Sequence, residues 1–128
     1  MKAWIALPLL SLLGACATTG GADSGTPTAA WLAGTWLLIQ PDLRFPAACA
    51  SGLPIRYDPD GTSHLFGERG TWRLDGDQLT ETIVVSDEED AQLGRIVLNR
   101  IRRAGPNRML KTFEDGETET FLRCPPAR

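Results

Sequence analysis

Ser63 and His64 are the first residues of this chain whose types suggest catalysis, because Asp58 and Asp60 lie just before them. Serine, histidine and aspartate form a hydrolase triad when the nucleophile and the base lie within hydrogen-bond distance. The segment around Ser63 and His64 favours a strand, and adjacent residues of a strand point to opposite faces. The two side chains therefore do not pair easily, and we expect no catalytic residue and no enzymatic activity.

Acidic residues at two places could attract a cation. Asp58-x-Asp60-Gly61 has part of a calcium-loop pattern, but the further ligands and the distal glutamate are missing. The run Asp87-Glu88-Glu89-Asp90 is typical of a solvated hairpin tip, and a weak site for a divalent cation or a basic partner is the alternative. One histidine and three cysteines leave little material for a metal cage. We expect neither a metal site nor a cofactor.

Arginines cluster around one predicted hairpin, and glutamates follow in the next. The residues are Arg95, Arg100, Arg102, Arg103 and Arg108, then Glu114, Glu117 and Glu119. Cross-strand ion pairing on a solvated face is the simpler interpretation, and it contributes about 0.2–1 kcal/mol per pair. The alternative is that Arg100, Arg102 and Arg103 bind an acidic ligand or an anionic partner. The formal net charge of −3 lacks the basic excess of a nucleic-acid binder, so we expect no such partner.

Residues 1–16 have the pattern of a targeting signal. Lys2 is followed by an apolar stretch, 3–13, which is shorter than the roughly 20 apolar residues that a membrane-spanning helix needs. The tetrapeptide Leu13-Gly14-Ala15-Cys16 resembles the bacterial lipobox, in which cleavage before the cysteine is coupled to its lipidation. The resemblance implies a lipoprotein signal peptide over 1–15 and acylation of Cys16, palmitate included, as a membrane anchor. An ordinary secretory signal is the alternative.

Residues 16–29 are predicted to be the lipidated cysteine and a flexible tether rich in Gly, Ser, Thr, Ala and Pro. Ala17, rather than an aspartate, follows the cysteine. By resemblance to enterobacterial sorting rules, this implies the outer membrane of the cell envelope. We therefore expect the domain over 30–128 to face the periplasm.

Cys49 and Cys124 are the two cysteines that remain if Cys16 is lipidated. An even number of cysteines in an oxidising compartment favours a disulfide between them. The alternative, a redox-active thiol pair, lacks the usual C-x-x-C spacing.

The rest of the chain has no long helical periodicity, and turn signals separate short apolar stretches. We expect strands over 35–40, 53–57, 62–66, 70–74, 78–86, 95–103, 108–114 and 117–124. Asp75-Gly76 and Asp115-Gly116 are strong signals for two-residue hairpins. Successive hairpins predict an all-β, antiparallel, eight-stranded up-and-down meander, and closure into a small barrel removes its exposed edges.

The segment Trp31-Leu32-Ala33-Gly34-Thr35-Trp36 resembles the opening of lipocalin-like (calycin) barrels. In that family a short helical turn leads into a Gly-x-Trp at the start of the first strand. An arginine near the end of the last strand then packs across this tryptophan and closes the base of the barrel. The resemblance covers residues 31–124 in topology and implies barrel-closing roles for Gly34, Trp36 and Arg123, but no particular ligand.

These features predict a non-catalytic envelope lipoprotein whose barrel binds a small apolar or amphipathic ligand near Trp36, Trp72 and Phe66. One alternative is a protein-binding module, because small one-disulfide lipoproteins also resemble periplasmic protease inhibitors, which would use the segment before Trp31. Another is an envelope structural or assembly factor. An interior void of at least about 300 Å³ favours a ligand, and an interior filled by large side chains favours a surface-acting protein.

Overall fold

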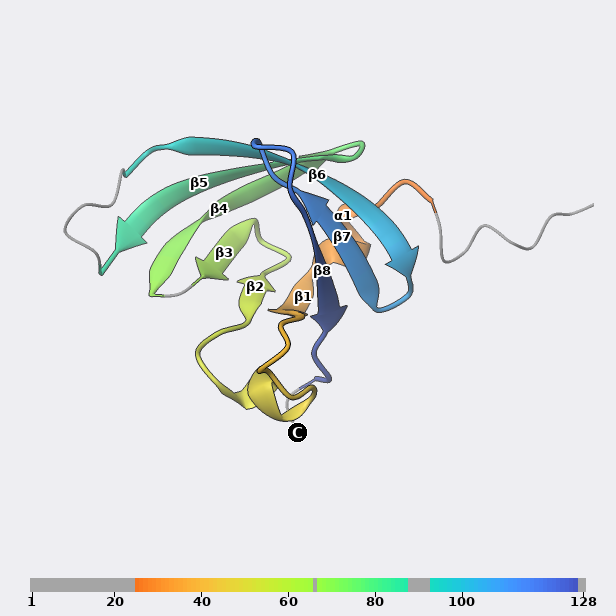
Figure 1. The fold of residues 1–128 in the computed structure, drawn as a ribbon. Coiled ribbons are helices and arrows are strands. Elements are labelled where there is room, and N and C mark those ends of the chain that lie inside the picture. Colours follow the sequence, from red (N-terminus) through yellow and green to blue (C-terminus); the bar gives the residue numbers. More distant parts are fainter. Residues whose placement is uncertain (1–24, 66, 88–92, 127–128) are drawn as a thin grey trace, which may run out of the picture.

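A computed structural model describes residues 25–65, 67–87 and 93–126 of the protein. The elements are α1 (Ala29–Leu32), β1 (Gly34–Leu38), the 3-10 helix η2 (Ala47–Ala50), β2 (Ile55–Tyr57), β3 (Thr62–Leu65), β4 (Glu68–Asp75), β5 (Gln78–Ser86), β6 (Ile96–Gly105), β7 (Arg108–Thr112) and β8 (Thr118–Arg123). The strands form one closed antiparallel barrel in sequence order, and β1 also pairs with β8. Figure 1 shows the long strands β4 to β6 arching over the shorter β1 to β3.

The predicted fold class is confirmed: the protein is an all-β meander of eight antiparallel strands that closes into a barrel, with a short helical turn before β1. This architecture is consistent with a lipocalin-like fold. β5 has the predicted bounds, but the two-residue loop before it is Gly76-Asp77 rather than Asp75-Gly76, because Asp75 ends β4 and pairs with Gln78. The two-residue hairpin predicted at Asp115-Gly116 is wrong, since β7 ends at Thr112 and β8 begins only at Thr118. β2 is shorter than predicted and begins at Ile55, since Pro54 has no N–H to donate to a neighbouring strand.

The half of the barrel next to α1 is filled by large apolar and aromatic side chains. The most deeply buried are Leu32, Trp36, Tyr57, Leu79 and Met109. Trp72 packs edge-on against Tyr57 with ring centroids 5.6 Å apart, and its Nε1 donates to the carbonyl oxygen of Asp58. Trp36 and Trp72 are therefore core residues in this half.

Arg123, at the end of β8, lies across Trp36 at the base of the barrel. Its guanidinium carbon is 4.2 Å from the centroid of the Trp36 ring. The guanidinium also donates to the carbonyl oxygens of Ala33 and Trp31. Gly34 has a φ of +137°, and a Cβ at this position would lie 2.7 Å from Arg123 Nη1, so the close approach of the arginine requires glycine.

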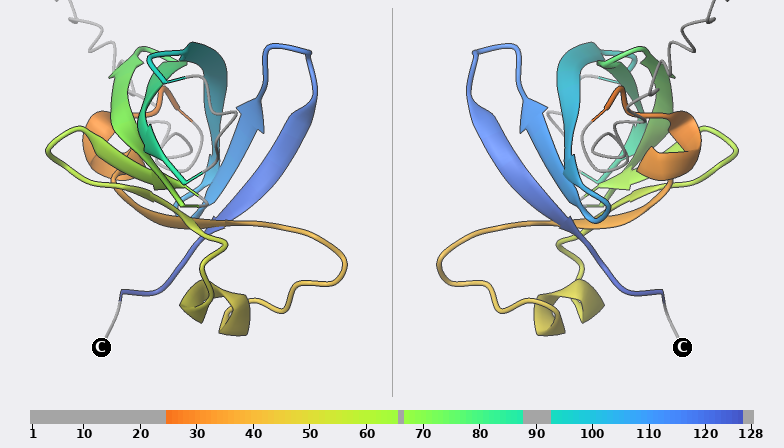
Figure 2. Two further views of the ribbon diagram at one scale, coloured as in Figure 1. Left: turned by 90° about the vertical axis from the view of Figure 1, so that its left-hand side faces the viewer. Right: turned by 90° about the vertical axis from the view of Figure 1, so that its right-hand side faces the viewer.

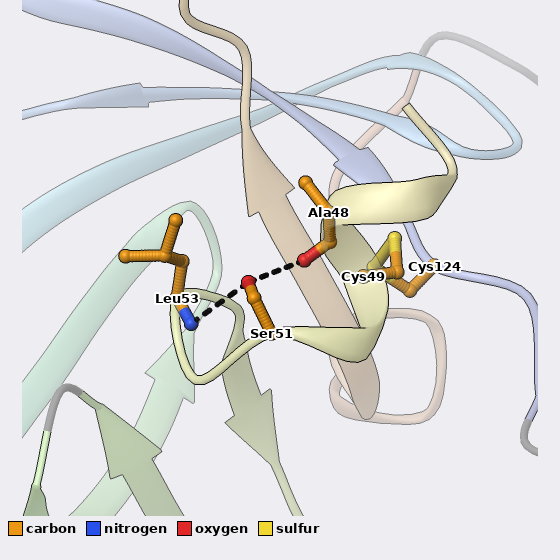
Figure 3. Close-up of a disulfide and its surroundings, with 5 residues drawn as sticks. All are labelled: Ala48, Cys49, Ser51, Leu53 and Cys124. Atoms are coloured by element: carbon orange, nitrogen blue, oxygen red, sulfur yellow. Dashed lines mark hydrogen bonds between the residues drawn. A yellow bond between two sulfur atoms is a disulfide. The ribbon is translucent and has the colours of Figure 1, made fainter. Parts of the chain in front are cut away.

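The predicted disulfide between Cys49 and Cys124 is confirmed. It joins η2, in the long β1–β2 connection, to the residue after β8, and η2 lies outside the barrel below β1 (Figures 1 and 2). Ser51 orders the connection locally, because its hydroxyl donates to the carbonyl oxygen of Ala48 and accepts from the N–H of Leu53 (Figure 3). The bridge thus ties this long connection to the C-terminal strand.

The predicted signal peptide, Cys16, the tether as far as residue 24, and Phe66 lie outside the described residues. Within them, Pro27 is buried, and the hydroxyl of Thr28 caps α1 by accepting from the N–H of Trp31. In the parts of the chain that the structure describes, no helix has the length and apolar character needed to cross a membrane.

Candidate functional site

The barrel contains a cavity of about 150 Å³ at the end away from α1. Its lining comes from β3, β4, β5 and β6 and from Lys111 and Phe113, at the end of β7. Because neighbouring strands run in opposite directions, the end of β3, the start of β4, the end of β5 and the start of β6 meet at this end of the barrel. Much of the wall is apolar, formed by Leu65, Ile83, Val97 and Phe113.

Three polar residues of the lining, Glu81, Asn99 and Lys111, are bonded to one another and to the fully buried Tyr57. Lys111 Nζ lies 3.0 Å from Glu81 Oε2 and donates to the hydroxyl oxygen of Tyr57 at 3.1 Å. The Tyr57 hydroxyl donates to Glu81 Oε1 at 2.7 Å, and Asn99 Nδ2 donates to Glu81 Oε2 at 2.8 Å. We call these four residues the polar network; it lies where the cavity meets the filled half of the barrel.

The ammonium group of Lys111 is almost completely shielded from solvent, since the side chain is only 3% exposed. Glu81 compensates the charge, and the ammonium also lies 5.5–5.9 Å from the ring centroids of Tyr57, Phe113 and Phe121. Such distances allow cation–π attraction, which strengthens when water is excluded. The lysine is thus stabilised by one carboxylate and three aromatic rings.

Tyr57 is held in its protonated form by the same arrangement. Burial raises the pKa of its phenol well above the ordinary value, and the nearby Glu81 carboxylate raises it further by its charge and by accepting the phenolic proton in a hydrogen bond. The hydroxyl therefore acts as a fixed donor to Glu81.

Asn99 has an unused acceptor. Glu81 Oε2 can only accept a hydrogen bond, so Asn99 must turn its amide nitrogen toward it, and this fixes the orientation of the amide. Its Oδ1 is buried and has no hydrogen-bond partner among the residues that the structure describes. Unpaired buried carbonyl oxygens are uncommon in proteins.

Two of the three aromatic residues predicted to surround a ligand lie away from the cavity. Trp36 and Trp72 pack in the filled half of the barrel, and neither lines the cavity. Phe66 is outside the described residues, so its position relative to the cavity is not described.

The predicted arginine cluster is divided between the two faces of β6. Arg100 faces outward and pairs with Asp77 at 3.0 Å. Arg102 also faces outward, and its side chain makes no hydrogen bond or ion pair with any described residue. Arg103 is half-buried on the inner side, where its guanidinium carbon lies 5.0 Å from the Trp31 ring centroid. Burial and the charge of Arg103 lower the pKa of Arg123.

In the part of the chain that the structure describes, Arg95 is the one arginine of the cluster that pairs with a predicted glutamate, Glu114, at 4.0 Å. Ser63 and His64 point in opposite directions from β3, as the strand pattern predicts. Ser63 lines the cavity, and His64 Nε2 lies 3.1 Å from Asp58 Oδ2, outside it.

Sequence reasoning did not single out Glu81, Asn99 or Lys111. Each interrupts an otherwise apolar alternation: Glu81 lies between Leu79 and Ile83, Asn99 between Val97 and Ile101, and Lys111 between Met109 and Phe113. A polar residue at an inward position of a strand must find a partner inside, because an unpaired buried charge is very costly. That interruption is the signal by which the network could have been found.

No protein-family model matches the chain, and no curated protein or solved structure matches it at a significant level. The fold and the site alone therefore define the class: a small closed β-barrel with an apolar-walled cavity next to a buried polar network.

Proposed function

We propose that the protein is a non-catalytic binding protein of the bacterial envelope, which holds one small amphipathic molecule in the barrel cavity. The observation that carries this proposal is the composition of the cavity, whose wall is largely apolar and whose polar groups converge from three strands. Binding sites for small molecules typically combine apolar walls with a few fixed polar groups.

The size of the cavity limits the ligand. Its volume of about 150 Å³ falls short of the void of at least about 300 Å³ expected from the sequence for a ligand-binding barrel, so the cavity is too small for a drug-sized molecule. Apolar cavities of about 150 Å³ accommodate benzene in other proteins. The proposed ligand is therefore a compact molecule of about six to eight non-hydrogen atoms rather than a long acyl chain.

The proposal can be tested with phenol as a probe, titrated into the full-length protein and followed by isothermal calorimetry. A compact ligand of this size is expected to bind with a dissociation constant of roughly 0.1–1 mM. Val97→Phe fills the cavity and should abolish binding. Leu98→Phe is the matched control, because Leu98 is the next residue of β6 and faces outward with 43% exposure.

Binding of phenol to the wild-type and Leu98→Phe proteins, with none to Val97→Phe, would support the proposal. Equal uptake by all three proteins would indicate partition into detergent or at the surface and would contradict it. Native mass spectrometry of protein purified from cells would then identify the natural ligand by its mass.

Membrane attachment through acylated Cys16 is the other part of the proposal. The support is the lipobox-like sequence, and two or more acyl chains are sufficient for stable anchoring. Cys16→Ala should abolish metabolic labelling with palmitate and move the protein from the outer-membrane fraction to the soluble fraction. Continued membrane fractionation of the unlabelled variant would contradict the anchor.

A protein-binding function is the second candidate, and one observation favours it. Five large apolar side chains of the β5–β6 region are exposed, namely Val84, Val85, Leu93, Ile96 and Leu98. If this outer face binds an envelope protein, such as a protease, Ile96→Ser should weaken that complex and leave phenol binding unchanged. The segment before Trp31 is a less suitable binding arm, since Pro27 is buried.

A further inference from the structure

We infer that the outward-facing arginines near the β6–β7 turn bind phosphate groups of the phospholipid membrane to which the chain is anchored. These residues are Arg100, Arg102 and Arg108, and we call them the arginine surface. The inference rests on the membrane attachment proposed above and adds how the domain lies on that membrane. It does not depend on the ligand of the cavity.

Arg102 and Arg108 lie close together on the outer face of the barrel. Arg102 pairs in register with Leu110, and Arg108 is two residues before Leu110 on β7. Alternate residues of a strand share a face, and Met109 is buried in the core, so Arg108 and Leu110 point outward. Both arginines are exposed. Their guanidinium groups can therefore meet the same partner surface.

The positive charge of Arg102 and Arg108 is not compensated within the described part of the chain. Neither side chain forms an ion pair with a residue that the structure describes. The neighbouring carboxylate of Asp77 is already paired with Arg100 at 3.0 Å. Two free positive charges thus lie side by side on a protein whose formal net charge is −3.

The opposite end of β7 is acidic. Glu114, Asp115 and Glu117 follow this strand and are exposed, and they lie at the end of the barrel that contains the cavity. A surface of negative phosphates attracts the arginine end and repels the acidic end. The expected orientation therefore places the arginine surface on the membrane and turns the cavity end away from it.

The N-terminal segment joins the domain beside the arginine surface. Residues 25–27 form one side of a hollow of about 460 Å³, and Arg100 and Arg102 are part of its other side. Gly25 is nine residues after Cys16, and nine residues span at most about 30 Å. A lipid anchor at Cys16 therefore keeps the arginine surface close to the bilayer.

The chemistry of this surface fits phosphate. A guanidinium group is planar and binds phosphate through two parallel hydrogen bonds. Thr112 and Thr118, in the lining of the same hollow, bond to each other through their hydroxyl groups at 2.8 Å. That bond uses one of the two hydroxyl hydrogens, so the other is free to donate to a phosphate oxygen.

The test uses the acylated wild-type protein, labelled with ¹⁵N in its arginines, in nanodiscs of phosphatidylcholine and phosphatidylglycerol. A gadolinium-chelate lipid in the nanodisc broadens the NMR signals of groups that lie close to the membrane. We expect stronger broadening of the Nε–H signals of Arg102 and Arg108 than of Arg44 and Arg69. These two arginines are also exposed, but they lie in the β1–β2 connection and near the start of β4, at the cavity end.

The double variant Arg102→Gln/Arg108→Gln distinguishes binding by these arginines from proximity caused by the anchor, and Arg100 serves as its reporter. Each arginine near an anionic surface contributes roughly a factor of five, so the equilibrium constant for contact should fall about 30-fold. The broadening of Arg100 should be lost accordingly. Arg44→Gln/Arg69→Gln changes the net charge equally and should leave this broadening unchanged.

The outcomes separate the surface from the anchor. If the protein is not acylated and does not enter nanodiscs, the proposed anchor fails and the inference fails with it. If the protein enters nanodiscs but Arg102→Gln/Arg108→Gln leaves the broadening of Arg100 unchanged, the anchor stands and the inference is wrong. Equal loss in both double variants would indicate an effect of net charge and would also overturn the inference.

Inorganic phosphate is the probe for the other source of the same chemistry. It is titrated into the Cys16→Ala protein, and the arginine signals are followed by NMR. A shift of the Arg102 signal with phosphate, without its broadening in nanodiscs, would assign the surface to a soluble anion and would contradict membrane binding.

Discussion

Lys111 Nζ and Glu81 Oε2 lie 3.0 Å apart inside the barrel, although their strands, β7 and β5, are separated by β6. The contact crosses the interior rather than following a strand pairing. It holds a lysine that is 2% exposed, and it also fixes the acceptor to which Tyr57 and Asn99 donate. The pair therefore sets the charge balance of this part of the interior and the hydrogen-bond acceptor of Tyr57 and Asn99.

Lys111→Met should lower the free energy of unfolding by about 3–5 kcal/mol, because Glu81 would remain in the interior without a compensating charge. Chemical denaturation followed by circular dichroism measures the loss. Arg108→Met on the same strand is the control, since Arg108 is exposed, and it should change stability by less than about 0.5 kcal/mol. Equal effects of the two substitutions would show that the buried pair does not stabilise the fold.

Gly34→Ala should destabilise the protein by about 1–3 kcal/mol, because an alanine would adopt an unfavourable φ. Its Cβ would also displace the Arg123 guanidinium from the base of the barrel. Gly52→Ala is the matched control, since a Cβ there would have no atom within 4 Å. Thermal denaturation of both variants makes the comparison, and a melting temperature for Gly34→Ala equal to that of Gly52→Ala would contradict this role of Gly34.

Replacing Cys49 and Cys124 by serine should lower stability by up to about 4.5 kcal/mol, because the bridge restricts the unfolded chain over a long loop. Urea denaturation of the double variant measures this loss. Treatment of the wild-type protein with a reductant should reproduce the shift of the urea midpoint. If the bridge is reduced and the urea midpoint does not change, the stabilisation does not come from the disulfide.

Stability should fall as the pH rises above about 10, because an unfolded tyrosine loses its proton there. In the folded protein the pKa of Tyr57 is raised by burial and by Glu81, so the folded state keeps that proton. This contribution is complete below the unfolded pKa and is lost as the pH rises through the folded pKa. Tyr57→Phe should make the alkaline decline in stability shallower.

The chain has a single tyrosine, so its ultraviolet absorbance reports Tyr57 alone. Tyrosinate absorbance should be absent from the folded protein near pH 10 and present in the urea-unfolded protein. If Tyr57 lost its proton at the same pH in the folded and the unfolded protein, this would contradict the burial of its hydroxyl and the hydrogen bond to Glu81.

Local signals were sufficient to predict most of the strands. The turn signal at Asp75-Gly76 and the alternation in 78–86 predicted the bounds of β5 correctly, because turn chemistry and strand periodicity act over a few residues. The start of β2 was less predictable, and it lies at Ile55, two residues later than expected. The long connection before it is ordered by η2 and the disulfide, and these depend on contacts with the far end of the chain.

The candidate site was harder to predict, because its residues are far apart in the sequence. Tyr57, Glu81, Asn99 and Lys111 lie on four different strands, and only the register of the closed sheet brings them together. Trp36 and Trp72 were predicted to lie near a ligand. Trp36 and Trp72 are large enough to fill the barrel, and for that reason they are part of the core and not of the cavity.

The sequence by itself determined that this protein is a meander of antiparallel strands with one disulfide, because hairpin turns, alternation and the number of cysteines can be read locally. Only the tertiary structure decided which half of the barrel is filled and which half is hollow. It also decided that a lysine, a glutamate and an asparagine meet inside the barrel. The physical reason is that packing and charge compensation depend on which side chains share the interior, and the closure of β8 on β1 sets that arrangement for the whole sheet.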